Sequence, residues 1–217
     1  MQPAGAAPAR AVRRDMPEGN MIRRAYAAGT RTQAGTPGAK YWQVWTDYRI
    51  TARFDSATST VTGRESVTFR NDSDSAMRGI VLRLDQNIFR PDAARTDVMD
   101  AITGGMKVTR LVLNGQTLAV GDTIGTPIPG TTRRTTPIAR TLRQTSARFA
   151  LANPIAAHSI GTMEAEWSFE VPNIPNGRGF RMGRWADTLY QVAQWYPRVA
   201  VFDDLRLGDR SYGGWDT

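Results

Sequence analysis

One segment of this sequence alternates apolar and polar residues so regularly that it restricts the chain to a sheet-based fold. Met163, Ala165, Trp167, Phe169 and Val171 point to one side, and the intervening residues, three of them glutamates, point to the other. A two-residue period over nine positions is typical of a strand with one buried face and does not match the 3.6-residue period of a helix. The segment therefore predicts a half-buried β-strand.

Weaker alternation of the same kind recurs through the middle of the chain. It predicts further strands at residues 48–54, 61–69, 80–84, 108–113 and 141–151. The Asn114-Gly115 pair indicates a tight hairpin, with Leu118 and Val120 on the returning strand. Residues 123–137 are polar and proline-rich, which is typical of a loop. Closely spaced strands with little helix between them predict a mainly β fold, an antiparallel sandwich or saddle-like sheet.

The composition changes near residue 40. Residues 1–40 are rich in Ala, Gly, Pro and Arg, and we interpret them as a flexible basic leader. Within it, residues 21–28 suit a short helix, with Asn20 as N-cap and Gly29 as the stop. Residues 41–207 then form the β domain. The last ten residues, 208–217, are interpreted as a truncated continuation.

Charge and apolar runs bear on the classes of partner. The net charge is +8, but five of these charges lie in residues 1–40, where aromatic residues are few. Such a tail can touch phosphates without forming a surface that reads bases, so we expect no nucleic-acid partner. No apolar run reaches the roughly 20 residues that span a bilayer, so no transmembrane segment is expected. No signal peptide is visible either.

No complete catalytic centre is visible. The sequence contains no cysteine, and His158 is its only histidine. A zinc site usually needs at least two histidine or cysteine ligands, and no Gly-x-Ser-x-Gly elbow is present. We therefore predict no catalytic residue and no metal ligand in this chain. His158 is interpreted as a histidine in a surface loop.

A glycine-rich stretch at residues 177–183 superficially resembles a phosphate-binding loop. Its spacing differs from the dinucleotide fingerprint, and it follows a turn cluster, so we interpret it as a flexible loop. Its neighbouring arginines could bind an acidic partner or a neighbouring domain: Arg178, Arg181 and Arg184.

The carboxylates of Asp203 and Asp204 adjoin an apolar run. Such a pair can bind a cation or serve in acid–base chemistry. More often it caps a turn or pairs with arginine, and Arg198 and Arg206 are close in the sequence. We favour this structural interpretation.

Residues 190–204 combine amides, aromatic residues, a proline and the acidic pair. Aromatic and amide groups together suit a surface that packs on one side and hydrogen-bonds a ligand on the other. The alternative interpretation is a segment that packs against another domain.

The same region carries a family resemblance. Gln194-Trp195-Tyr196-Pro197-Arg198, followed by residues 199–204, resembles the N-terminal domain of bacterial zinc aminopeptidases related to aminopeptidase N. Three further segments agree in order: residues 38–50, 84–89 and 166–172. Together the resemblance covers about residues 36–206.

The resemblance implies a non-catalytic β-saddle domain that covers the active site of a following catalytic domain. In such enzymes this domain contributes a Gln or Glu that binds the free α-amine of the peptide. Gln194 is the first match for that role and Gln191 the second. An amide oxygen can accept a hydrogen bond from an ammonium group without being ionised.

The resemblance also implies what lies outside the chain. The His-Glu-x-x-His helix is absent, so we expect zinc, the general base and the catalytic domain beyond Thr217, and we expect this chain to be inactive alone. An exported protein, periplasmic or secreted, would fit the family. The alternative is a stand-alone β-sandwich module that binds a protein or peptide.

A second segment is similar to a motif of these enzymes, but we do not interpret it as a substrate-binding motif. Gly161-Thr162-Met163-Glu164-Ala165 is similar to the Gly-x-Met-Glu-Asn motif of the same enzymes. However, Ala165 replaces the asparagine, and the motif precedes the Trp-Tyr-Pro-Arg run instead of following it.

Overall fold

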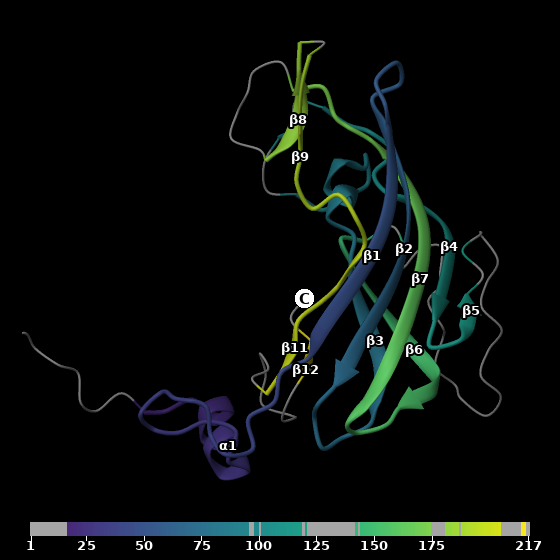
Figure 1. The fold of residues 1–217 in the computed structure, drawn as a ribbon. Helices are drawn as coiled ribbons and strands as arrows, with labels where there is room; N and C mark the ends of the chain where they lie inside the picture. The colour runs from purple at the N-terminus through teal and green to yellow at the C-terminus, as the bar shows by residue number, and fades with distance from the viewer. Residues whose placement is uncertain are drawn as a thin grey trace, which may run out of the picture.

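The structure, a computed structural model, confirms that the chain is mainly β and built from antiparallel strands. It describes residues 17–95, 98–99, 101–118, 120, 142, 144–174, 181–186 and 188–204, and the backbone of residues 214–215. Long curved strands run through the body, with the hairpin of β8 (Met182–Trp185) and β9 (Leu189–Val192) at one end and helix α1 (Asn20–Ala28) at the other (Figure 1).

The larger sheet has the strand order β1-β2-β7-β4-β5. Its strands are β1 (Trp45–Asp55), β2 (Thr60–Asn71), β7 (Ser159–Glu170), β4 (Lys107–Leu113) and β5 (Gln116–Leu118). Buried and exposed residues alternate along β2 and β7, which confirms the strands predicted from the two-residue period.

The smaller sheet has the order β10-β3-β6, and its side chains pack with those of the larger sheet to form the core. Its strands are β10 (Arg198–Val199), β3 (Met77–Arg83) and β6 (Ser146–Ile155). Ile80 and Leu82 of β3 are buried in the same cluster as Leu111 of β4 and Phe169 of β7. The strand predicted at 141–151 begins later, at Ser146, because Gln144 and Thr145 are in a bend.

The Asn114-Gly115 hairpin between β4 and β5 is confirmed. Both residues have positive φ angles, 47° and 79°. A two-residue turn of this kind requires left-handed backbone at both positions, which asparagine and glycine adopt most easily. The loop predicted at residues 123–137 lies outside the described residues.

Helix α1 lies within one residue of the predicted position. It starts at Asn20, with Gly19 in the N-cap position instead of Asn20. Gly29 ends it at φ 76°, where its N–H donates to the carbonyl of Tyr26 at 3.0 Å. None of the helices in the described ranges is long and apolar enough to cross a membrane.

The described part of the leader is attached to the body through Asp204. The Thr30 hydroxyl donates to one carboxylate oxygen of Asp204 at 2.7 Å, and the Arg31 guanidinium donates to both. The Asp204 side chain is completely buried, and the closest Arg31 contact is 2.6 Å. Asp204 is therefore structural, as expected, although its arginine partner comes from the leader and not from the residues near it in the sequence.

The β8–β9 hairpin extends from the end of β7. The N–H of Arg184 donates to the carbonyl of Pro172 at 2.8 Å. The Arg184 guanidinium also donates to the Ser59 hydroxyl, in the turn between β1 and β2, and the ring of Tyr190 packs on Phe54. These contacts hold the β8–β9 hairpin against the turn between β1 and β2 (Figure 1).

Candidate functional site: a basic cavity at Gln194

The chain from β9 to β11 (Phe202–Asp203) crosses the gap between the two sheets. On one side, β10 pairs with β3, and the N–H of Ala200 donates to the carbonyl of Val81 at 2.8 Å. On the other side, the N–H of Val199 donates to the hydroxyl of Tyr48 on β1 at 3.0 Å. Residues 193–200 are therefore held from both sheets, which fixes the position of the sequence-predicted site residue Gln194.

Gln194 has left-handed backbone, with φ 44°. A buried glutamine holds this bend: the Gln86 side-chain amide donates to the carbonyls of Ala193 and Gln194, each at 3.0 Å. Gln86 belongs to the 3-10 helix η1 (Asp85–Phe89). A non-glycine residue in this conformation usually needs such support from its surroundings.

The neighbouring Asn87 anchors η1 in turn. Its amide nitrogen donates to the carbonyls of Leu142 and Gln144, and its oxygen accepts from the N–H of Met106. Asn87 is fully buried, so each of these bonds replaces one that water would otherwise make. The two segments of the family resemblance at 84–89 and 194–204 thus meet in space through side-chain hydrogen bonds.

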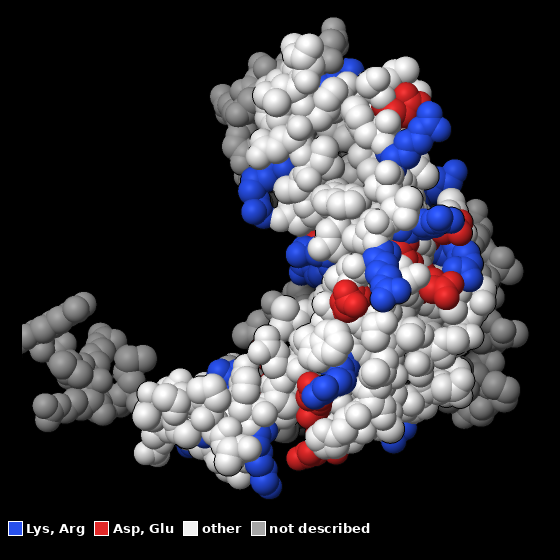
Figure 2. Space-filling view, viewed as in Figure 1, with Lys and Arg blue, Asp and Glu red and all other residues white. Residues whose placement is uncertain are grey.

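Gln194 lines a cavity of about 490 Å³ between η1, β3, β8 and β10. The volume lies in the range of about 300–1,000 Å³ that is usual for small-molecule sites. The lining residues are Arg83, Asp85, Gln86, Ile88, Phe89, Thr145, Arg181, Met182, Ala193, Gln194 and Arg198. Three arginines and one aspartate make this lining net positive, and Figure 2 shows basic side chains along the hollowed edge below the β8–β9 hairpin.

Asp85 joins two of these arginines. Arg83 contacts one of its carboxylate oxygens at 3.1 Å and Arg198 the other at 2.5 Å. The Nε atoms of Arg83 and Arg198 are buried and have no hydrogen-bond partner among the described residues. Arg198 was expected to pair with the Asp203-Asp204 carboxylates, and the structure pairs it with Asp85 instead.

The other candidate, Gln191, lies elsewhere. It is on β9, opposite Gly183 of β8, and its side chain is exposed. It falls outside the set of described residues that line the cavity. Of the two candidate residues, therefore, Gln194 lines the cavity and Gln191 does not.

Below the crossing segment lies a row of aromatic rings. Trp195 contacts Trp167 of β7 at 5.7 Å between ring centroids and Tyr196 at 5.1 Å, and Tyr196 contacts Tyr48 at 5.3 Å. All three are edge-on arrangements, which aromatic pairs favour. The aromatic half of the motif therefore packs against the core, and Gln194 lines the cavity.

Glu65 of β2 lies on this apolar side, opposite Ile50 and Ala165 in the sheet. The residue is 3% exposed, and neither carboxylate oxygen has a hydrogen-bond partner among the residues that the structure describes. Burial raises its pKa to about 8, because the charged form loses its hydration. The hydroxyl of Tyr48 is also buried, which raises its pKa, and the charge of Glu65 adds to that effect.

Glu65 falls within the strand predicted at residues 61–69, but the sequence assigned it no role. The available signal was a charged residue in register with Val61, Val67 and Phe69. No comparable sequence signal marks Arg83 and Asp85, because Asp85 contacts Arg83 and Arg198 only in the folded chain.

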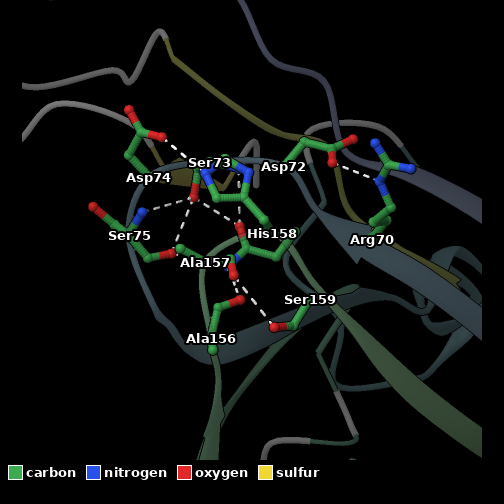
Figure 3. A network of polar contacts seen from close by, with 10 residues as sticks. Arg70, Asp72, Ser73, Asp74, Ser75, Ala156, Ala157, His158 and Ser159 are labelled. Atoms are coloured by element: carbon green, nitrogen blue, oxygen red, sulfur yellow. Dashed lines mark hydrogen bonds and ion pairs between the residues drawn. The ribbon is translucent and has the colours of Figure 1, made fainter.

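His158 lies in a surface turn, as expected. It has φ 55° in the turn between β6 and β7, and its Nε2 lies 3.0 Å from a carboxylate oxygen of Asp74 in the turn between β2 and β3. Figure 3 shows these two turns side by side, with Ser73 bridging backbone groups and Arg70 paired with Asp72. Buried Asn71 joins the turns by donating to the carbonyls of Ser75, Ile155 and Ala156.

The structure also describes the other sequence motifs in part. Glu164 of the segment at residues 161–165 is half-exposed on β7 and pairs with Arg110 at 2.6 Å. Of the glycine-rich stretch, residues 177–180 lie outside the described residues, and Arg181 and Gly183 belong to the β8 hairpin region. Within the described ranges, no three His, Cys, Asp or Glu side chains are grouped so as to hold a metal ion.

Comparison with known proteins gives no assignment. No protein-family model matches the chain, and no curated protein shows significant sequence similarity to it.

Proposed function

We propose that this chain is the N-terminal, non-catalytic β domain of a zinc aminopeptidase, and that Gln194 helps to bind the free α-amine of a peptide. Zinc and the reacting groups would belong to a separate catalytic domain. The proposal rests on the resemblance around residues 194–204 and on one structural observation. That observation is the position of Gln194, which lines a ligand-sized cavity on a backbone bend supported by Gln86.

The geometry supports a binding role in two ways. First, Gln194 is anchored to both sheets through the segment that contains it, so its amide can be positioned without a large ordering cost on binding. Second, Trp195 and Tyr196 occupy the core side of the same segment. The motif therefore divides into residues that hold the segment and one residue available to a ligand.

The experiment compares two small peptides that differ only in the amine. Alanyl-alanine amide and its N-acetyl derivative are titrated into the isotope-labelled chain, and affinity is read from shifts of the backbone amide and indole signals near Trp195. We expect acetylation to weaken binding at least about fivefold, because it removes a charge-assisted hydrogen bond. Gln194→Ala should remove most of that difference.

Two further variants locate the effect. Gln43→Ala is the matched control, since Gln43 is an exposed glutamine before β1 and away from this cavity, and it should bind both peptides as the parent chain does. Gln191→Ala tests the second candidate. Equal affinity for the free and the acetylated peptide, or an unchanged difference in Gln194→Ala, would refute the role proposed for Gln194.

A further inference from the structure

The charge of the cavity conflicts with binding an amine alone. Its lining contains three guanidinium groups and a single carboxylate, so an isolated ammonium group would enter a region of net positive potential. A ligand that carries a carboxylate beside its amine would avoid this cost. The charge balance therefore bears on which peptides the cavity accepts.

Asp85 shows that the arginine cluster accommodates a carboxylate. Its two oxygens are shared between Arg83 and Arg198, so one carboxylate is held between two guanidinium groups. Each of these guanidiniums still has a buried Nε without a partner in the described part of the chain. Because these two Nε atoms are buried, a ligand would meet the other N–H groups of the guanidiniums, and planar guanidinium groups suit carboxylates in particular.

Arg181 supplies the third positive charge. Its side chain is exposed at the edge of the cavity, and no hydrogen bond or ion pair to its guanidinium is found within the described ranges. Its backbone is fixed relative to the Gln194 segment, because its carbonyl accepts from the N–H of Ala193 at 3.1 Å. Arg181 is therefore an exposed cation, on a fixed backbone, that a ligand can reach.

We propose that the cavity prefers peptides whose first residue is acidic, with Arg181 as the main partner of the side-chain carboxylate. This inference rests on the proposed function, because it takes the α-amine to lie at Gln194. Arg83 and Arg198 would add attraction, although Asp85 already neutralises part of their charge. The carboxylate also offsets the repulsion that the basic lining exerts on the amine.

The test separates the acidic preference from amine recognition. The parent chain is titrated at low ionic strength and pH 7 with aspartyl-alanine amide, asparaginyl-alanine amide, N-acetyl-asparaginyl-alanine amide and inorganic phosphate. We expect the aspartyl peptide to bind about two to five times more tightly than its asparaginyl isostere, which is the range for an exposed charge pair. Added salt should reduce this ratio.

Arg181→Gln should bring the ratio close to one and leave the affinity for the asparaginyl peptide within about twofold. Arg53→Gln is the matched control, since Arg53 is an exposed arginine on β1 outside the cavity lining, and it should keep the full ratio.

The outcomes distinguish the two proposals. Equal affinity for the aspartyl and asparaginyl peptides would overturn the acidic preference, even if acetylation still weakens binding. Phosphate that binds as tightly as the aspartyl peptide would overturn it too, because the cavity would then be a general anion site. A preference that survives in Arg181→Gln would overturn the role of Arg181. Acetylation without effect would overturn the proposed function, and absence of binding by all three peptides would overturn both.

Discussion

Replacing Glu65 with glutamine should remove a large part of the pH dependence of stability. The carboxyl has a pKa of about 8 in the folded chain against 4.5 for the unperturbed group, because burial opposes its charged form. The unfolded chain therefore releases this proton from about pH 4.5 upward, while the folded chain retains it until about pH 8. A raised folded pKa means that stability is fully present below pH 4.5 and declines as the pH rises toward 8.

The magnitude follows from the size of the shift. Each pH unit in this window costs about 1.4 kcal/mol, so raising the pH from 5 to 8 should lower the free energy of unfolding by about 3 kcal/mol through Glu65 alone. Glu65→Gln has nearly the same shape but cannot ionise. Its stability relative to the parent chain should therefore rise by about 3 kcal/mol over the same interval.

Urea unfolding followed by tryptophan fluorescence at pH 5, 6, 7 and 8 measures this difference. The signal is well placed, because Trp167 and Trp195 contact one another next to β2. Glu164→Gln is the matched control: the same substitution on β7, at a half-exposed carboxylate, should leave the pH dependence within about 0.5 kcal/mol of the parent. Parallel pH profiles for the parent chain and Glu65→Gln would refute the conclusion that Glu65 is held neutral by burial.

Two further substitutions test how the leader is attached and how β2 packs against Trp167 of β7. Asp204→Ala should release the described part of the leader and lower the free energy of unfolding by about 2–3 kcal/mol, because the Arg31 guanidinium and Thr30 lose their buried acceptor. Urea unfolding measures the free energy, and faster tryptic cleavage at Arg31 reports the release. Unchanged cleavage would contradict this prediction. Gly63→Ala should lower the free energy of unfolding by about 1–3 kcal/mol, because a new Cβ would lie 2.4 Å from the Trp167 ring. The control Gly104→Ala, with open space around the new Cβ, should lower it by less than about 0.5 kcal/mol. Equal thermal midpoints for the two alanine variants would argue against this packing.

Much of the fold could be predicted because its signals are local. A strand with one buried face repeats every two residues, so β2, β4 and β7 were recognisable within a few residues of their ends. The Asn114-Gly115 turn was equally clear, since few other pairs adopt its backbone angles easily. Helix α1 had a glycine stop at its end. The β8–β9 hairpin carried no such signal, because its strands have four residues each, too few to establish a period.

The candidate site was predictable only in part. The run beginning at Gln194 stood out by its composition, and the structure places that residue at a cavity. Its support came from Gln86, more than a hundred residues away, and a hydrogen bond between such distant residues leaves no trace in local sequence. Asp85 likewise becomes a partner of Arg198 only after β10 pairs with β3.

The sequence by itself determined the class of fold and the inward faces of β2 and β7, because the hydrophobic effect acts on a pattern that these strands carry within themselves, whereas the far end of β1, with Ala52 and Phe54, is exposed. The same alternation puts Glu65 in register with the apolar residues Val61, Val67 and Phe69. Only the tertiary structure decided what covers the inward face of β2 and which charges meet. In the folded chain Glu65 is buried, and the crossing of residues 193–200 gathers Arg83, Arg181 and Arg198 around one cavity. Burial and electrostatic interaction depend on distances in space, and these exist only once the two sheets have packed.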